Sequence, residues 1–413
     1  MPAVPPLLAS ARRLLLAFFF IGLAQPIVGT FTTIFLWRQG KSFPILVLYT
    51  LALHLFLPLG FFLSYRLVGR VTHKFLFLLG TIGAGTIPLL LIFSPTFLPA
   101  VIISFGALFG IAQGFLWSTR NYLTLKATTK ESRLHFSSIE SLIGTLCGII
   151  IPFLIGWGLE IGTKMNWFTT LQGYRWMGIM GCLLLGIGGI LVYDHHESLP
   201  KPTPLKLLPP TPQWNLLRSM DFIQGIANGI ATILPLILTI TFIGVEGAVG
   251  TLGSIGAGLT GIVIFIAGRY ATHRHHLKIL PIPLFIDLFA AAIAILAPPH
   301  IGIILFLVTS VATGALRWWI TVATMYHAVE MEKKLTGSSN EGLLLDRELV
   351  LNIGRVLGLG LFLLAYHLTP TQAPFIAIAF MALIQITLYP ICKKLDTYEK
   401  NKHSFSASSH LSG

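Results

Sequence analysis

Residues 14–37 read LLLAFFFIGLAQPIVGTFTTIFLW and contain no Asp, Glu, Lys or Arg. As a helix this stretch is long enough to cross a hydrocarbon layer, which requires about 20 residues. Similar uncharged stretches recur at residues 42–65, 222–245 and 247–268. The recurrence predicts a chain that crosses a membrane many times.

Composition agrees with this prediction, because 54% of the 413 residues are hydrophobic and only 10% are charged. An ordinary soluble domain carries about 25% charged residues. Two longer uncharged stretches, 75–119 and 356–392, contain turn formers at 94–96 and 369–371, so each predicts a helical hairpin. We expect an all-α polytopic membrane protein of about twelve transmembrane helices. The predicted helices lie near residues 14–37, 43–65, 75–93, 97–119, 137–158, 174–193, 219–243, 247–268, 278–297, 301–324, 348–367 and 373–392.

The net charge of +13 does not indicate a nucleic-acid partner, because the positive residues are distributed by side of the membrane. Most of the 28 Lys and Arg lie in the terminal segments and in the loops that follow even-numbered predicted helices. The other side carries only Arg38, Lys41, Lys164 and Arg175. This positive-inside bias predicts that both termini are cytoplasmic.

Neither a disulfide framework nor a metal site is predicted, because the three cysteines show no paired spacing. We expect no cofactor. The chain also lacks an Asn-x-Ser/Thr sequon, which favours a bacterial cytoplasmic membrane.

The longest polar connection, residues 194–216, is rich in proline and predicts a cytoplasmic linker. It separates an N-terminal six-helix bundle at 1–193 from a C-terminal six-helix bundle at 217–392, and 393–413 form a cytoplasmic tail. The halves resemble each other, since GRVTHK at 69–74 is similar to GRYATHR at 268–274. Such repeats are typical of secondary transporters.

Six plus six helices, cytoplasmic termini and a basic connection after the second helix resemble the major facilitator superfamily. The resemblance covers nearly the whole chain, but Gly69 and Gly268 stand where the family usually carries an Asp. It implies alternating access around a central cavity lined chiefly by the first, fourth, seventh and tenth helices. It also implies a small-molecule substrate, and we expect a monomer in the cell membrane.

Residues 144–156 carry glycines and a proline spaced by four, a pattern that partly resembles the antiporters of this family. The alternative is that these small residues let helices pack closely in lipid. Efflux is therefore favoured only slightly over uptake.

Charged residues inside a membrane segment cost at least about 2.5 kcal/mol each, so each of them raises a functional hypothesis. Glu348, Asn352 and Arg355 fall on one face of the helix at 348–367, and Arg317 lies at a similar depth in the helix at 301–324. Two guanidinium groups suit an anionic substrate group. The alternative is that Glu348 only neutralises Arg355 within its own helix.

Other polar residues complete the predicted site. Asp221, Gln224 and Asn228 form a stripe on the helix at 219–243, although Asp221 near the helix end could instead be a cap or a solvated residue. Asp287 ranks lower because the ninth helix is peripheral in the family. The predicted substrate-binding residues are Gln25, Gln113, Trp117, Gln224, Asn228, Arg317, Asn352 and Arg355.

Coupling to protons requires a carboxylate that binds and releases a proton near neutral pH. Glu348 is the first candidate, Glu140 the second and Asp221 the third. Two alternative functions remain open: a lipid flippase or lipid exporter on the same fold, and an integral membrane enzyme. The enzyme is less favoured, because no clustered metal, acid–base or phosphate-loop motif is present. We therefore expect a transporter that is not an enzyme.

Overall fold

The computed structural model describes residues 7–40, 43–193, 199, 209–242, 246–270, 279–395 and 397. These residues form helices and no strand, so the predicted all-α fold is confirmed for the described part of the chain. Ten of the described helices are long and apolar enough to cross a membrane, and Pro281–Leu296 and Ile301–Arg317 are shorter apolar helices. The chain is therefore a multi-pass helical membrane protein.

The helices divide into two compact units. The first unit comprises Met1–Thr203 and Ile233–Gly261, and the second comprises Pro204–Thr232 and Ile262–Gly413. Helices α8 (Pro212–Phe242) and α9 (Glu246–Tyr270) each contribute residues to both units. Most of the predicted linker, 194–216, lies outside the described residues, and its last residues form the first turn of α8.

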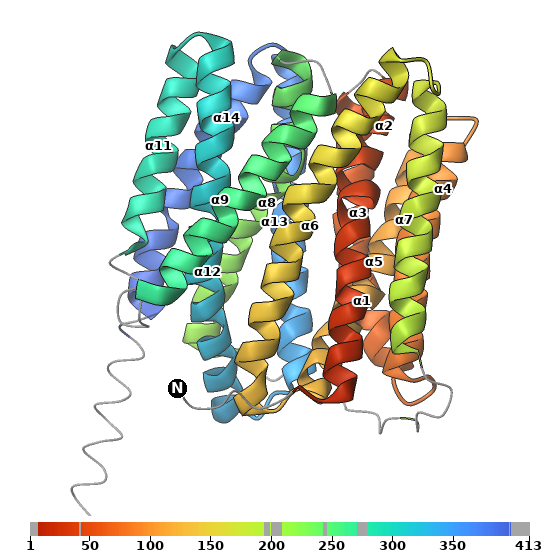
Figure 1. Ribbon diagram of the computed structural model, residues 1–413. Helices are drawn as coiled ribbons and strands as arrows, with labels where there is room; N and C mark the ends of the chain where they lie inside the picture. Colours follow the sequence, from red (N-terminus) through yellow and green to blue (C-terminus); the bar gives the residue numbers. More distant parts are fainter. Residues whose placement is uncertain are drawn as a thin grey trace, which may run out of the picture. The chain divides into compact units, whose positions relative to one another are not determined.

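The first unit is built around α3, α5 and α7. Its α3 packs against α5, α4 packs against α5 and α7, and α1 packs against α6 and α7, as Figure 1 shows. Close approach of α3 and α5 depends on small residues, since a Cβ at Gly110 would lie 2.3 Å from the Leu53 carbonyl oxygen. The elements are α1 (Ala9–Pro26), η1 (Ile27–Phe31), α2 (Thr32–Gly40), α3 (Phe43–Leu67), α4 (His73–Phe93), α5 (Pro99–Ala127), α6 (Lys130–Lys164) and α7 (Thr170–Val192).

The first predicted helix is interrupted by a π-helical turn. Pro26 lacks the N–H group of a regular helix, and residues Ile27–Phe31 directly after it form the π-helix η1. Such turns are frequent at functional sites. Gln25 lies two residues before this turn, so a predicted binding residue is close to the distortion of the backbone.

Among the described residues, the second unit contains the start of α8, the end of α9 and four further helices. Helix α11 packs against α12 and α14, and α13 packs against α14. Helices α8 and α13 approach closely, because a Cβ at Gly358 would lie 2.2 Å from the Ile226 carbonyl oxygen. The four helices are α11 (Pro281–Leu296), α12 (Pro299–Thr336), α13 (Asn340–Leu368) and α14 (Ala373–Ile386).

Every predicted helix overlaps an observed helix, but several observed helices are longer. Helix α6 begins at Lys130 rather than 137, because Thr129 and Ser132 form a capping box at its start. Helix α12 continues to Thr336 rather than 324, and the residue after it, Gly337, has a left-handed φ of 72°. These ends are set by a capping box and by a glycine cap, which hydropathy does not detect.

Candidate functional site

The first unit contains a cavity of about 300 Å³ between α1, α5 and α6. Gln25, Trp117 and Glu140 line it, so three predicted site residues from three helices meet at one place. The remaining lining is mainly apolar, and includes Phe18 and Ile21. A mainly apolar cavity with a few polar groups is the usual form of a small-molecule site.

Arg120 also lines this cavity, and its guanidinium is held on several sides. It forms an ion pair with Glu140. Its Cζ lies 5.1 Å from the ring centroids of both Phe18 and Trp117, which is cation–π geometry. Sequence reasoning missed Arg120 because it placed this residue in a cytoplasmic loop just beyond the predicted helix. Helix α5 instead continues to Ala127.

Gln113 lies one turn from this cavity. Its side-chain oxygen accepts a hydrogen bond of 2.9 Å from the Trp117 indole N–H, and the residue is buried. Gln113 therefore holds the Trp117 ring in position and does not itself line the cavity. Gly144, from the predicted glycine pattern, lines the cavity as well.

The second unit contains a smaller cavity of about 50 Å³. Gln224 and Asn228 on α8 line it together with Arg317 on α12. Gln385 on α14 adds a further buried amide. The structure thus brings Arg317 together with two predicted substrate-binding residues that lie about 90 positions earlier in the sequence.

Arg317 is paired with Asp287 on α11. The Thr313 hydroxyl donates to the same carboxylate, so one acid receives contacts from two residues on α12. The Asp287 side chain is buried and that of Arg317 is 13% exposed, and both residues lie in apolar helices. A buried pair of this kind reduces the cost of each charge. Asp287, which ranked low from the sequence, is therefore the direct partner of the predicted arginine.

Arg355 belongs to a separate network on α8 and α13. Its Nη1 donates to the Asn352 side-chain oxygen at 3.1 Å, and the Asn352 amide donates to the Glu348 backbone oxygen at 2.8 Å. Asn352 therefore connects Glu348 with Arg355, where the sequence suggested a direct pair. Arg355 does not appear among the described residues that line the Arg317 cavity.

Asp221 joins this network through Arg347. The Arg347 Nε lies 3.2 Å from Asp221 Oδ2, and the Arg347 Nη1 lies 3.6 Å from Glu348 Oε1. Asp221 is only 1% exposed and lies more than two turns inside α8, so it is neither a cap nor a solvated residue. Its Oδ1 has no hydrogen-bond partner among the described residues. Sequence reasoning missed Arg347.

A third group of contacts ties the first turns of α9 to other helices of the first unit. Glu246 forms an ion pair with Arg38 on α2 and accepts a hydrogen bond of 3.3 Å from the Tyr174 hydroxyl. The Gly247 N–H donates to Glu160 on α6 at 3.0 Å. We call this group, Arg38, Glu160, Tyr174, Glu246 and Gly247, the α9 clasp.

The small residues of α6 contribute to the same contact. A Cβ at Gly156 would lie 2.6 Å from the Glu246 carbonyl oxygen, and one at Gly148 would lie 3.1 Å from the Ala257 Cβ. These glycines therefore allow α6 and α9 to pack closely. This geometry agrees with the alternative interpretation of residues 148 and 156, in which small residues let helices pack closely.

No metal centre is evident in the described part of the chain, which contains no group of three or more His, Cys, Asp or Glu able to hold an ion. The polar residues at the two cavities form hydrogen bonds and ion pairs between apolar helices. These features define the class: a multi-pass helical membrane protein with charged residues inside its helix bundles.

Comparison with known proteins finds two similar sequences, neither of which has an established activity. No family model matches the chain. The chain is 22% identical over 339 residues to the uncharacterized protein YqgE of Bacillus subtilis (strain 168), covering 81% of this chain and 78% of that protein. It is 28% identical over 189 residues to an uncharacterized protein in the sodM 3′ region of Geobacillus stearothermophilus, covering 43% of this chain and 87% of that protein.

Proposed function

We propose that the protein is a secondary active transporter of the major facilitator type, which moves a small solute across the membrane by alternating access. One observation carries this proposal. In each unit, an arginine lines a cavity and forms an ion pair with a carboxylate on a neighbouring helix. Arg120 is paired with Glu140 in the first unit, and Arg317 is paired with Asp287 in the second. Charges this costly inside apolar helices favour a solute pathway over a purely structural bundle.

The substrate of such a site is a small solute with an anionic group. A guanidinium binds carboxylate or phosphate through two parallel N–H donors and stays charged inside the membrane. A substrate anion would compete with Glu140 or Asp287 for the arginine that each of them holds. The Trp117 and Phe18 rings beside Arg120 suit an apolar or aromatic portion of the same molecule.

Proton coupling has three candidate carboxylates: Glu348, Glu140 and Asp221. Asp221 has the strongest support from the geometry, because one of its buried oxygens has no donor among the described residues and is able to carry a proton. Glu348 and Arg347 adjoin it, so protonation of one acid alters the charge balance of the whole network. Export in exchange for protons is the direction that we propose.

Alternating access is supported by the α9 clasp. Residues on both sides of the predicted linker meet in it, since Arg38 precedes residues 194–216 and Glu246 follows them. In the topology that the charge bias predicts, with twelve helices in two six-helix bundles and cytoplasmic termini, the clasp lies at the extracellular end. An ion pair at that position is able to close one end of a pathway and to break when the protein changes state.

A comparison of cells with and without the gene tests this function. Small-molecule and lipid contents would be measured in the deletion strain and in strains complemented with the wild type, Arg317→Gln or Leu305→Ala. Leu305 is exposed on the same helix and is the matched control. We expect a water-soluble anion to change on deletion, and to be restored by the wild type and by Leu305→Ala but not by Arg317→Gln.

Other outcomes would overturn the proposal in distinct ways. A change confined to one lipid species would indicate a flippase or lipid exporter on this fold. An accumulated precursor with a missing product would indicate a membrane enzyme. Complementation by Arg317→Gln equal to that by the wild type would remove Arg317 from the solute site.

A further inference from the structure

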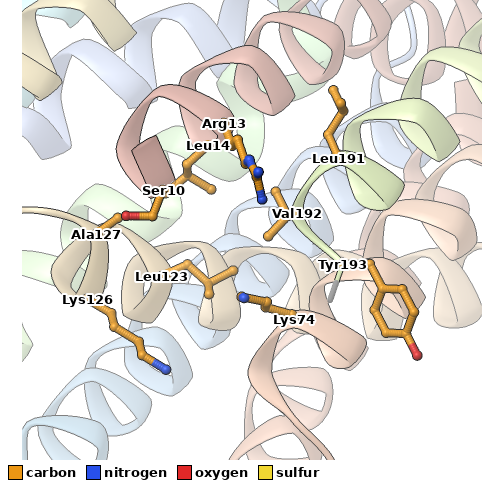
Figure 2. Close-up of a pocket in the computed structure, with 10 residues that line it drawn as sticks. All are labelled: Ser10, Arg13, Leu14, Lys74, Leu123, Lys126, Ala127, Leu191, Val192 and Tyr193. Atoms are coloured by element: carbon orange, nitrogen blue, oxygen red, sulfur yellow. The ribbon is translucent and has the colours of Figure 1, made fainter. Parts of the chain in front are cut away.

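Amide side chains are concentrated at one of the described cavities. The cavity of about 50 Å³ beside Arg317 is lined by three of them, Gln224 and Asn228 on α8 and Gln385 on α14. Among the described residues, the lining of the Arg120 cavity contains one amide. The cavity of about 220 Å³ at the helix ends of the first unit, which Figure 2 shows, contains none in its described lining. Three amides around so small a volume indicate a specific hydrogen-bonding role.

The side-chain amides at this cavity form no hydrogen bond with any described residue. Gln224 is 7% exposed and Gln385 is 4% exposed, so both are buried. Gln113, buried to the same 7%, shows the usual arrangement, since it accepts a hydrogen bond from the Trp117 indole. A buried amide that lacks such a partner is unfavourable, so buried amides in native proteins are normally bonded. The two buried amides therefore favour a ligand that supplies hydrogen bonds.

The Arg317 guanidinium offers further donors at the same cavity. Its Nη1 forms the ion pair with Asp287, which holds the side chain in place. Its Nη2 lies on the side of Gly314, because a Cβ at that glycine would be 3.6 Å from it, and Gly314 also lines the cavity. A guanidinium has several N–H donors in a fixed plane, so Nη2 is able to bind an anionic group.

A hydroxyl group beside the anionic group of a ligand would satisfy both parts of this lining. An amide presents N–H donors and a carbonyl acceptor, and a hydroxyl is able to donate and to accept at one position. A methyl or methylene group in the same place forms no hydrogen bond and leaves the amides unpaired. A site built to bond a hydroxyl therefore rejects an analogue that lacks it.

We propose that the anionic solute of this transporter carries a hydroxyl group next to its anionic group, as a small hydroxy acid does, and that Gln224, Asn228 and Gln385 bind this hydroxyl. The volume of about 50 Å³ admits the anionic group and the atoms beside it, and any larger remainder of the solute would lie outside the cavity. Resting on the proposed function, this assignment narrows its substrate class from solutes with an anionic group to hydroxylated ones.

Two pairs of carboxylates test the assignment, since the members of each pair differ by one hydroxyl: glycolate with acetate, and lactate with propionate. Their dissociation constants are measured with the purified full-length protein in a neutral detergent, from the concentration dependence of Tm. The wild type is compared with the double variant Gln224→Leu/Gln385→Leu and with the control Gln372→Leu. Gln372 is an exposed residue before α14 that lines none of the described cavities.

In the wild type, each hydroxy acid should bind at least about tenfold more tightly than its partner without the hydroxyl, as one hydrogen bond to a buried amide implies. The double variant should lose this preference to within about twofold, because Leu keeps nearly the shape of Gln but offers no hydrogen bond. It should still bind acetate and propionate, since Arg317 is unchanged. Gln372→Leu should keep the full preference.

Unfolding without ligand separates recognition of a solute from a structural role. Neither amide of the double variant bonds to a described residue in the wild type, so this variant should unfold at the wild-type Tm or above it. Gln113→Leu, which loses the hydrogen bond to Trp117, should unfold at a lower Tm. A clear loss of Tm in the double variant would show that the two amides stabilise the fold, and would overturn their assignment to the solute.

Other results of the binding measurements would also overturn the assignment. Equal binding within both pairs by the wild type means that no hydroxyl is recognised, and it leaves the proposed function standing because an anion still binds. A preference that persists in the double variant, or that disappears in Gln372→Leu, excludes these amides as its source. If none of the four carboxylates binds, the hydroxy-acid class is rejected, while the deletion strain still decides the proposed function.

Discussion

Asp287 on α11 forms a buried ion pair with Arg317 on α12, and Thr313 donates to the same carboxylate. The pair joins α11, which is peripheral in the predicted arrangement, to α12, which lines the second cavity. Each charge is tolerated inside the unit because the other is present. The two residues therefore act as one structural element, and substitutions of them should not have additive effects.

Replacing Asp287 alone should destabilise the protein strongly. Asp287→Asn leaves the Arg317 charge buried without its carboxylate, which costs about 3–5 kcal/mol. The double variant Asp287→Asn/Arg317→Gln removes both charges and should recover a large part of that loss. The measurement is the Tm of each purified variant in detergent, arranged as a double-mutant cycle.

Lys164→Gln provides the control for this cycle, because it breaks an ion pair whose basic partner is exposed to 71%, although Glu160 itself is exposed to only 9%. Its effect should be about 0.5 kcal/mol or less. Additive losses in the Asp287 and Arg317 variants would contradict the pairing.

Close packing of α8 against α13 should depend on one glycine and not on its neighbour. A Cβ at Gly358 would lie 2.2 Å from the Ile226 carbonyl oxygen, whereas one at Gly360 would meet no atom within 4 Å. Gly358→Leu should therefore cost at least about 1–3 kcal/mol through overpacking, and Gly360→Leu should not lower stability. Thermal unfolding of the two variants measures the difference. Equal Tm values would show that these helices do not pack this closely.

The helices could be predicted from the sequence because lipid imposes a simple rule on long apolar stretches. Charge-free segments such as 14–37 and 42–65 each mark a crossing, and the observed helices lie over them. The ends of the helices are harder to predict from the sequence, because they depend on local contacts. Helix α6 begins with a capping box formed by Thr129 and Ser132, and a hydropathy profile does not detect such a contact.

The candidate site could be predicted only in part, because a sequence shows which polar residues enter the membrane but not which helices meet. The helical spacing correctly placed Gln224 and Asn228 on one face, and they share a cavity. It gave no means of pairing Arg317 with Asp287. Arg120 was missed for a different reason: a basic residue near a helix end also fits a cytoplasmic loop.

Arg120 should be required for the metabolite change that depends on this gene. Arg120→Gln removes the partner of Glu140 and the cation above Phe18 and Trp117, so it should abolish complementation of the deletion strain. Arg120→Lys keeps the charge but loses the planar fork, and should restore only part of it. The measurement is the level of the solute identified by comparing the two strains.

Arg66→Gln is the control for Arg120, because Arg66 also lies over an aromatic ring, that of Phe62, but lines none of the described cavities. It should complement fully. Loss of complementation in both variants, with normal amounts of protein, would indicate a general need for positive charge instead of a role for Arg120 in the cavity.

The α9 clasp should control water access to the interior of the first unit. Glu246→Gln removes the ion pair with Arg38, and a partly exposed pair contributes up to about 1 kcal/mol. This shifts an equilibrium between closed and opened clasp by about fivefold. Ser254→Cys, a buried position on α9, reports the shift when the native cysteines are first replaced by alanine. Its rate of labelling by a water-soluble maleimide should rise about fivefold with Glu246→Gln and similarly with Arg38→Gln.

Charge reversal separates the ion pair from other effects of these substitutions. Arg38→Glu with Glu246→Arg restores opposite charges across the clasp and should return the labelling rate toward that of the parent. Arg175→Gln removes a positive charge from the same predicted side of the membrane, where it lies over the Phe93 ring, and should leave the rate unchanged. If all three single variants accelerate labelling equally, surface charge and not the clasp sets the access of water. If the reversed pair remains as accessible as Glu246→Gln, attraction between residues 38 and 246 does not hold α9 in place.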